Sequence, residues 1–295
     1  MGSPALRLSV PDAGTPGKVE VWRTGRDVVA GHHGGLAYSH DGRYLFCGGR
    51  VHHDENYAVA TEDMYLQALA LIEHMGYPTI ARMWNIVGGI TKPVDTGTTR
   101  YSEFCQARAR AFEQRGLTTA DMPAATGIGG HDDHTVVYLL ATRSGSIVRL
   151  ENPRQVPAYE YPDQYGIQPP SFARATYVRS PAGPGDLFIS GTASIVGHET
   201  VHLDDTEMQT RTTVDNIAAL VSTENLRAHG VDAELSLRDL DCVKVYVKHR
   251  HDLDTVRRIC AAALGPDTQV VYTIADVCRE DLLVEIEGFA SVHDR

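Results

Sequence analysis

Hydrophobic positions recur in the same order in the two halves of the chain. Two short apolar runs that end in glycine, residues 45–49 and 187–191, predict strands. After each run, apolar residues recur at helical spacing, which predicts helices over residues 61–75 and 206–229. The repetition indicates one architecture built twice.

The rest of each half continues the repeat. In the first half, the pattern predicts a strand at 81–87, a helix at 102–114 and two closing strands at 124–128 and 135–141. In the second half, it predicts a strand at 241–247, a helix at 253–264 and two closing strands at 268–277 and 282–290. Gly116 and Gly265 follow the second helix of each half and predict left-handed helix ends. This order predicts an α+β fold of two tandem halves, each a mixed sheet with helices packed on one face.

The boundaries of these halves follow from composition. Residues 1–30 predict a flexible lead-in, residues 31–150 the N-terminal half, and residues 171–295 the C-terminal half. Between the halves lies a linker, residues 151–170, rich in proline and tyrosine, and its prolines exclude a long helix. Two similar sheets packed side by side create a crevice, which is a common place for a ligand.

Composition narrows the class of protein. The chain has 295 residues, a hydrophobic content of 42% and a net charge of −11, which argues against binding nucleic acid. The sequence has no apolar run of membrane-spanning length and no apolar signal segment. Five cysteines without a CxxC pair predict reduced thiols in a cytoplasmic protein. Because two fused halves can satisfy contacts that small relatives make between subunits, we expect a monomer, with a trimer as the alternative.

Two histidine patterns invite a metal interpretation. Residues 198–202, HETVH, match the HExxH signature of helical zinc hydrolases. Gly197 and the β-branched Thr200 and Val201 disfavour a helix there, and in an extended chain His198 and His202 lie roughly 13 Å apart. Residues 131–134, HDDH, fall at a predicted hairpin turn. We therefore predict no metal site and no cofactor.

The terminal strand carries two carboxylates. Alternation places Glu285 and Glu287 on one face with Leu283 and Phe289. Two neighbouring carboxylates repel each other, so one is expected to have a raised pKa and to serve as a general acid. The same alternation also fits the exposed polar face of an antiparallel sheet.

Other candidate residues surround this strand in the predicted fold. Cys278 is either a nucleophile or a small apolar filler, about 10 Å along the hairpin from Glu285 by strand spacing. Arg108 lies near the apolar face of its predicted helix, so it would be semi-buried and need an anionic partner. Arg174 begins the strand after the linker. The linker tyrosines, including Tyr159 and Tyr165, could donate hydroxyls or simply pack in the crevice.

Five motifs in order give the chain a resemblance to the chorismatase family over residues 35–292. They are RYSEFCQARARAF, AATGIG, PRQVPAYEYPDQYGIQPPSFARA, SGTASIVGHE and CREDLLVEIEG, at residues 100–112, 124–129, 153–175, 190–199 and 278–288. The resemblance implies two tandem YjgF/RidA-like halves, a fold also called chorismate-mutase-like. It places the active site in the C-terminal half and implies chorismate as the substrate.

The resemblance also implies roles for individual residues. Glu285 is the expected catalytic acid, which protonates the enol ether of chorismate and releases pyruvate. Around the substrate carboxylates, the resemblance implies binding residues: Arg174, Arg108, Tyr159, Tyr165 and Tyr101.

Two fates of the ring are expected within this family. Internal attack of the ring hydroxyl gives an arene oxide and then 3-hydroxybenzoate, whereas attack by water gives 3,4-dihydroxycyclohexa-1,5-dienoate. This chain resembles the internal-attack branch at Gly191 and Cys278, so 3-hydroxybenzoate is the expected product, with 4-hydroxybenzoate as a further possible component.

Three other functions compete with this one. A RidA-like imine deaminase would carry a carboxylate-binding arginine before the terminal hairpin, and residues 267–272 contain none. The other two are a zinc hydrolase that uses His198, Glu199 and His202, and a ligand-binding module without catalysis.

Overall fold

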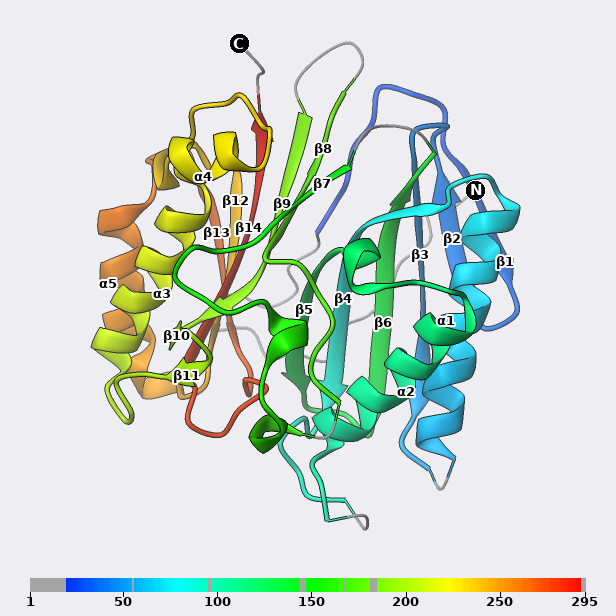
Figure 1. Ribbon diagram of the computed structural model, residues 1–295, viewed down its shortest axis with the longest axis horizontal. Coiled ribbons are helices and arrows are strands. Elements are labelled where there is room, and N and C mark those ends of the chain that lie inside the picture. The colour runs from blue at the N-terminus through cyan, green and yellow to red at the C-terminus, as the bar shows by residue number, and fades with distance from the viewer. Residues whose placement is uncertain are drawn as a thin grey trace.

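Two mixed sheets face each other in the centre of the molecule, with helices on their outer sides (Figure 1). The computed structural model describes residues 20–54, 56–94, 97–143, 147–166, 168–180 and 185–292. The predicted α+β fold of two tandem halves is confirmed. Among the described helices, none is both long and apolar enough to cross a membrane.

The first half forms a six-stranded sheet in the order β1-β2-β3-β6-β4-β5. Its strands are β1 (Val29–His33), β2 (Leu36–His40), β3 (Tyr44–His52), β4 (Thr79–Gly88), β5 (Ala124–Gly130) and β6 (His134–Thr142). On its outer face lie α1 (Tyr57–His74) and α2 (Arg100–Gln114), which bury a cluster of apolar side chains against the sheet. Gly116 ends α2 in the predicted left-handed conformation, with φ of 67°.

The second half forms a six-stranded sheet in the order β13-β12-β14-β9-β8-β7. Its strands are β7 (Ile147–Leu150), β8 (Ala175–Val178), β9 (Gly185–Ala193), β12 (Cys242–Val247), β13 (Gln269–Ile274) and β14 (Val284–Val292). Its helices are α3 (Thr206–Leu220), α4 (Thr223–Ala228) and α5 (Leu253–Ala263). This sheet begins at Ile147, four residues before the linker expected at 151.

Two sequence predictions in the second half are wrong. The helix expected over 206–229 is two helices, because Ser222 caps a new helix by accepting a hydrogen bond from Asn225 N. Gly265 does not have the left-handed conformation expected of it. A Cβ at Gly265 would overlap the backbone carbonyl of Arg238, so close approach of two backbones explains this glycine.

The two sheets have one topology, with a single local difference. β5-β4-β6-β3-β2-β1 corresponds strand for strand to β13-β12-β14-β9-β8-β7, and only the first pair of each series is parallel. β3 and β6 pair without interruption, whereas the register of β9 and β14 shifts between Ile286 and Gly288. Ser190 and Gly191 therefore lie together opposite Glu287, as a β-bulge.

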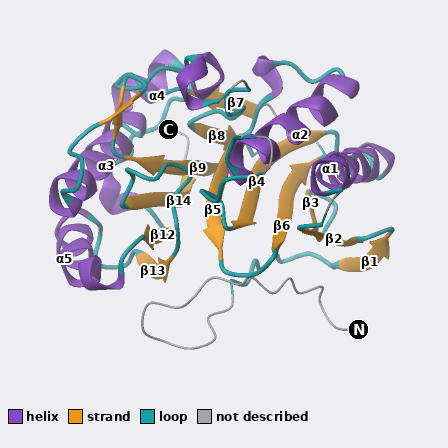
Figure 2. Cartoon of the chain, turned by 90° about the horizontal axis from the view of Figure 1, so that it is seen from below, coloured by secondary structure: helices purple, strands orange, loops and turns teal. Residues whose placement is uncertain are grey.

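The halves dock through their inner sheet faces and through the free edge of β5 (Figure 2). Ala124 N donates to Thr176 Oγ1 at 2.7 Å, and Ala125 N donates to Ser190 Oγ at 2.9 Å. These bonds satisfy backbone groups that an edge strand otherwise leaves unpaired. Among the described residues between the halves, the helical segments are two short 3-10 turns, η2 (Ala158–Glu160) and η3 (Asp163–Tyr165), which confirms the prediction that no long helix forms there.

Residues 20–28, part of the expected lead-in, cross the junction between the halves. The Trp22 ring packs on the rings of Trp84 of the first half and Phe188 of the second, with centroids 6.3 and 5.9 Å away. Glu20 forms an ion pair with Lys244 at 2.8 Å. This part of the lead-in therefore connects both halves; we call residues 20–28 the N-terminal strap.

Candidate active site

Glu285 and Glu287 lie on the central strand β14, and both point toward the other half of the molecule. The two residues are 4% and 3% exposed, so this is not the exposed face of a sheet. Phe289 faces the same side, as expected, and packs on Phe188. Leu283 does not, because β14 begins only at Val284, and Leu283 packs in the core beneath the helices.

Glu287 is the centre of a buried charge cluster, which we call the Glu287 cluster. Its carboxylate accepts from Arg82 Nη2 at 2.8 Å, Trp84 Nε1 at 2.9 Å and the Thr126 hydroxyl, and forms an ion pair with Lys244 Nζ at 2.9 Å. Burial alone would raise the pKa of Glu287, but Lys244, Arg82 and the hydrogen bonds outweigh burial and lower it to about 2. Glu287 is therefore ionised.

Glu285 has the opposite environment. Among the described residues no group hydrogen-bonds to its carboxyl. Burial, followed by the charge of Glu287, raises the pKa of Glu285 to about 8, while Arg82 and Arg174 oppose the rise. Glu285 therefore carries a proton at neutral pH, and the expected split between the two carboxylates is present in the structure.

Gly191 lies directly beneath the Glu285 carboxyl because of the β-bulge. A Cβ at this position would overlap Glu285 Oε1, so even alanine would displace the acid. Gly191 N donates to Thr126 Oγ1 at 3.0 Å, which ties the bulge to β5 of the first half. The structure therefore brings Gly191, which the resemblance implied as a product-selecting position, into contact distance of Glu285.

Cys278 and Tyr101 complete the surroundings of Glu285. Burial and then the charge of Glu285 raise the pKa of Cys278 to about 12, so its thiol is neutral and does not match a thiolate nucleophile. Burial and the neighbouring thiols of Cys105 and Cys278 raise the pKa of Tyr101 well above its usual value, so Tyr101 keeps its hydroxyl proton. Both are neutral groups that can donate hydrogen bonds.

Arg174 approaches Glu285 from the second half. It is 2% exposed, and its Nη2 donates to Tyr161 Oη at 2.7 Å and to the Val156 carbonyl at 2.8 Å. Its Nε lies 4.0 Å from Glu151 Oε2, and among the described residues neither atom has a hydrogen-bond partner. A buried guanidinium with a free donor is suited to receive an anionic ligand.

Arg108, the other candidate arginine, lies on α2 of the first half. It is buried on α2, stacks on Phe104 and Phe112, and its Nε has no hydrogen-bond partner among the described residues. No described carboxylate forms an ion pair with Arg108, although the sequence suggested an anionic partner. Its charge acts on Tyr101, which connects it to the surroundings of Glu285.

The linker tyrosines lie on the outer side of these groups. Tyr165 Oη contacts His198 Nδ1 at 3.3 Å, and its ring stacks on the Arg279 guanidinium at 3.7 Å. Arg279 Nη1 also donates to the His198 carbonyl at 3.0 Å. Tyr159 is partly exposed near Glu151 rather than beside Glu285. These contacts join the linker to the loop that carries Cys278.

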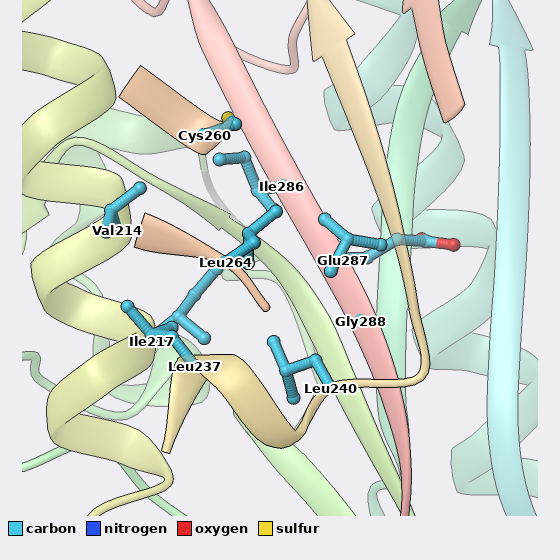
Figure 3. Close-up of a pocket in the computed structure, with 10 residues that line it drawn as sticks. Val214, Ile217, Leu237, Leu240, Cys260, Leu264, Ile286, Glu287 and Gly288 are labelled. Carbon is cyan, nitrogen blue, oxygen red and sulfur yellow. The ribbon is translucent and has the colours of Figure 1, made fainter. Parts of the chain in front are cut away.

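A cavity elsewhere in the second half is not the reactive site. It lies between α3, α5 and β14 and has room for about one water molecule, about 10 Å³. Figure 3 shows apolar side chains such as Ile217 and Ile286 around it, while the Glu287 side chain extends to the other side of β14. The cavity is a packing gap beneath the helices.

Sequence reasoning missed several residues that contact Glu287 or the linker tyrosines. The missed residues are Arg82, Trp84, Thr126, Lys244 and Arg279. A signal was present for Arg82 and Lys244, since each is a charged residue inside an otherwise apolar strand, where a buried charge requires a partner. Their partner lies in a distant strand, so pattern alone did not identify it.

The two histidine patterns do not have helical or clustered geometry in the part of the chain that the structure describes. The HExxH segment contains the short strand β11 (Glu199–Thr200), paired with β10 (Ile195–Val196), and His202 has a left-handed φ of 60°. The prediction that it is not helical is confirmed. Residues 131–133 connect β5 and β6, but this is not the predicted hairpin turn, because β4 lies between these two strands in the sheet. Among the described residues, no group of three or more His, Cys, Asp or Glu side chains could hold a metal ion.

Comparison with known proteins gives consistent matches. A family model described as chorismatase FkbO/Hyg5-like, N-terminal, matches residues 20–141. A 3-hydroxybenzoate synthase of Streptomyces hygroscopicus is 46% identical over 97% of this chain and 85% of its own length. A chorismatase of Streptomyces rapamycinicus is 45% identical over 91% of this chain and 81% of its own length.

The fold matches as well. A chorismatase crystal structure superposes with a TM-score of 0.86 at 45% identity, covering 89% of this chain and 79% of that one. The match extends across both halves rather than one, so it includes the face where Glu285 and the Glu287 cluster lie.

Proposed function

This chain belongs to the chorismatase family, and from that premise we propose that it converts chorismate to 3-hydroxybenzoate and pyruvate. The observation that carries the proposal is the buried Glu285, which holds a proton at neutral pH beside a glycine whose missing side chain makes room for its carboxyl. A proton donor of this kind is what cleavage of an enol ether needs.

The first step transfers the Glu285 proton to the terminal methylene carbon of the enolpyruvyl group. The resulting oxocarbenium withdraws electrons from the ether oxygen, and the bond between that oxygen and the ring carbon weakens. As this bond breaks, the electron pair goes to the oxygen and pyruvate leaves. Glu285 is then a carboxylate, able to accept the next proton.

The second step is attack by the neighbouring ring hydroxyl at the carbon that pyruvate leaves. The hydroxyl proton returns to Glu285, and the arene oxide opens and rearomatises to 3-hydroxybenzoate. No water is consumed, so chorismate gives the two products by rearrangement and cleavage alone. Gly191 and Cys278 form the wall at this position, where a neutral thiol and a missing side chain favour a ring hydroxyl over water.

Binding of the substrate's two carboxylates is assigned to arginines with free donors. Arg174 Nε lacks a hydrogen-bond partner among the described residues and acts electrostatically on Glu285. Arg108 has a similar free Nε behind Tyr101. We assign Tyr101, Tyr159 and Tyr165 supporting roles as hydroxyl donors or ring walls. Because charge-assisted bonds are strong, loss of Arg174 is expected to raise KM more than it lowers kcat.

The deciding experiment incubates the protein with chorismate and separates the products by chromatography, with pyruvate measured enzymatically. The expected result is equal amounts of pyruvate and 3-hydroxybenzoate. Glu285→Gln should lose about 100-fold to 10,000-fold in rate, as removal of a general acid does. Glu199→Gln is the matched control, because Glu199 is exposed on β11. Absence of pyruvate rejects the function, and a dihydrodiol as main product assigns the hydrolytic reaction instead.

We further propose that the protein is a monomer. The two halves cover each other's inner sheet faces within one chain, so the interaction between sheets needs no second copy. Light scattering coupled to size-exclusion chromatography tests this, and a mass of three chains would contradict it.

A further inference from the structure

The Glu287 cluster assembles opposite charges from different parts of the chain at one buried point. Arg82 comes from β4 of the first half and Lys244 from β12 of the second, and their side chains are 2% and 16% exposed. Thr126, on β5, donates to the Glu287 carboxylate and accepts from Arg82 and from Gly191 N. The proposed mechanism uses none of these charges directly.

We propose that Glu287 is a positioning residue of the reaction, a fixed negative charge held by Arg82 and Lys244 that keeps the neighbouring Glu285 protonated. The inference rests on the proposed function for its catalytic meaning, since it concerns the acid of that reaction. Glu287 itself touches no reacting atom in this account, because its oxygens are occupied by Arg82, Trp84, Thr126 and Lys244.

The geometry gives this charge a direct effect on Glu285. Residues two apart on a strand lie on one face, about 7 Å apart. At that distance in a buried site, one negative charge opposes a second by on the order of one to two pKa units. Glu285 has no hydrogen bond from the described residues to offset this repulsion, whereas the ionised form of Glu287 is stabilised by its partners. The two carboxylates therefore divide into one acid and one anion.

Other groups that face Glu285 do not reverse this division. They are Arg82 on β4, Arg174 just before β8, Cys278 in the loop after β13, Tyr101 on α2 and Tyr246 on β12. The thiol and the two phenols have raised pKa values and are neutral. Of the two arginines, Arg82 is already paired with Glu287. Glu287 is thus the main fixed charge that favours the protonated acid.

The arrangement combines residues of both halves and of the N-terminal strap. Arg82 reaches Glu287 only when the first half docks, and Glu20 of the strap shares Lys244 with Glu287. Without both Arg82 and Lys244 the buried Glu287 would have no compensating charge and could not be held ionised at low cost. Docking of the halves therefore completes the electrostatic environment of Glu285.

The test measures the protonation of Glu285 directly. Protein labelled with ¹³C at the glutamate carboxyls is titrated by NMR from about pH 4 to about pH 10. The Glu285 signal is assigned by its loss in Glu285→Gln. The same titration is recorded for two nearly isosteric charge variants, Glu287→Gln and Lys244→Met, and circular dichroism checks their folding.

The two variants should shift Glu285 in opposite directions. Glu287→Gln removes the negative charge and leaves Arg82 and Lys244 unneutralised, so the pKa of Glu285 should fall by about one unit or more. Lys244→Met removes a positive charge, so the pKa of Glu285 should rise. General loosening of the fold would instead lower both toward the ordinary value. Unchanged titrations, or shifts of the same sign, overturn the inference.

A second measurement separates this inference from the proposed function. At alkaline pH, kcat/KM for pyruvate release should decline with an apparent pKa. In each variant this apparent pKa should shift in the same direction as the pKa of Glu285 measured by NMR. Shifts in NMR without any chorismate turnover would reject the function and support the electrostatic role. Turnover in which the apparent pKa of this decline is the same in all variants would reject the inference and leave the proposed function intact. Should Glu287→Gln fail to fold, Glu20→Gln replaces it, with a smaller downward shift expected.

Discussion

The two sheets carry different residues at equivalent positions. In the first sheet Trp84 on β4 pairs with Tyr138 on β6, and their rings stack with centroids 4.9 Å apart. In the second sheet the matching pair on β12 and β14 is Lys244 and Glu287, an ion pair. One topology thus supports an aromatic stack in one half and a buried charge pair in the other.

The difference continues along the same strands. If Tyr138 of β6 corresponds to Glu287 of β14, then Val136, two residues earlier, corresponds to Glu285. The first half therefore has an apolar side chain where the second half has its acid. The bulge at Gly191 has no counterpart in the regular pairing of β3 and β6. Duplication therefore supplied two scaffolds, of which one carries the acid and the other contributes Arg82 and Thr126 from across the interface.

The largest expected effect comes from removing the cross-interface charge. Arg82→Met leaves the buried Glu287 carboxylate partly uncompensated, which should cost about 3–5 kcal/mol of unfolding free energy. At the equivalent position in the second half, Cys242→Ala should cost about 1 kcal/mol, the common size for a point change. Denaturant unfolding measures both. Equal losses would show that the two positions are alike despite their different partners.

The next effect is a pH dependence confined to the second half. Burial raises the pKa of Glu285 to about 8, so its contribution to stability is fully present below its unfolded pKa and is lost as pH rises toward 8. Relative to Glu285→Gln, the wild type should lose roughly 1 kcal/mol per pH unit between about pH 5 and about pH 8. Unfolding free energies across this range measure the slope.

Val136→Ala provides the matched comparison from the first half. Val136 has no charge, so its replacement should change the unfolding free energy by the same amount at every pH. A slope for Val136→Ala as steep as that for Glu285→Gln would assign the pH dependence to the fold in general.

The bulge should control both rate and product. Gly191→Ala places a Cβ against Glu285 Oε1, and a displacement of about 1 Å in a reacting group can cost about 100-fold in kcat. Combined with Cys278→Val, it should also raise the dihydrodiol share, measured by chromatography. Gly25→Ala is the control, since a Cβ there meets open space. An unchanged product ratio in the double variant would refute a role for these two residues in selecting the product.

The smallest effect is expected at the HExxH segment. Chelation, or His202→Asn, which tolerates the left-handed conformation, should change turnover by less than about twofold, because these histidines are not on one helical face. Loss of turnover on chelation and its recovery with zinc would make the segment part of the mechanism.

Sequence patterns predicted the strands and helices more accurately than the contacts between residues of different strands. Alternation placed Glu285 and Glu287 on one face, because side-chain direction along a strand has a fixed period. It could not say which carboxylate is the acid, since Arg82 lies 205 residues from Glu287 along the chain. Alternation also placed Leu283 on the wrong side, because hydrophobicity does not mark where β14 begins.

By itself the sequence determined the duplicated α+β halves, the linker, the pair of carboxylates and the resemblance to the chorismatase family, because periodicity, prolines and motifs are local properties. The resemblance already implied Glu285 as the acid, whereas the tertiary structure alone decided that Glu287 is the anion and that Gly191 occupies a bulge beneath Glu285. The physical reason is that burial and charge compensation depend on residues from β4, β5 and β12, which only folding brings together.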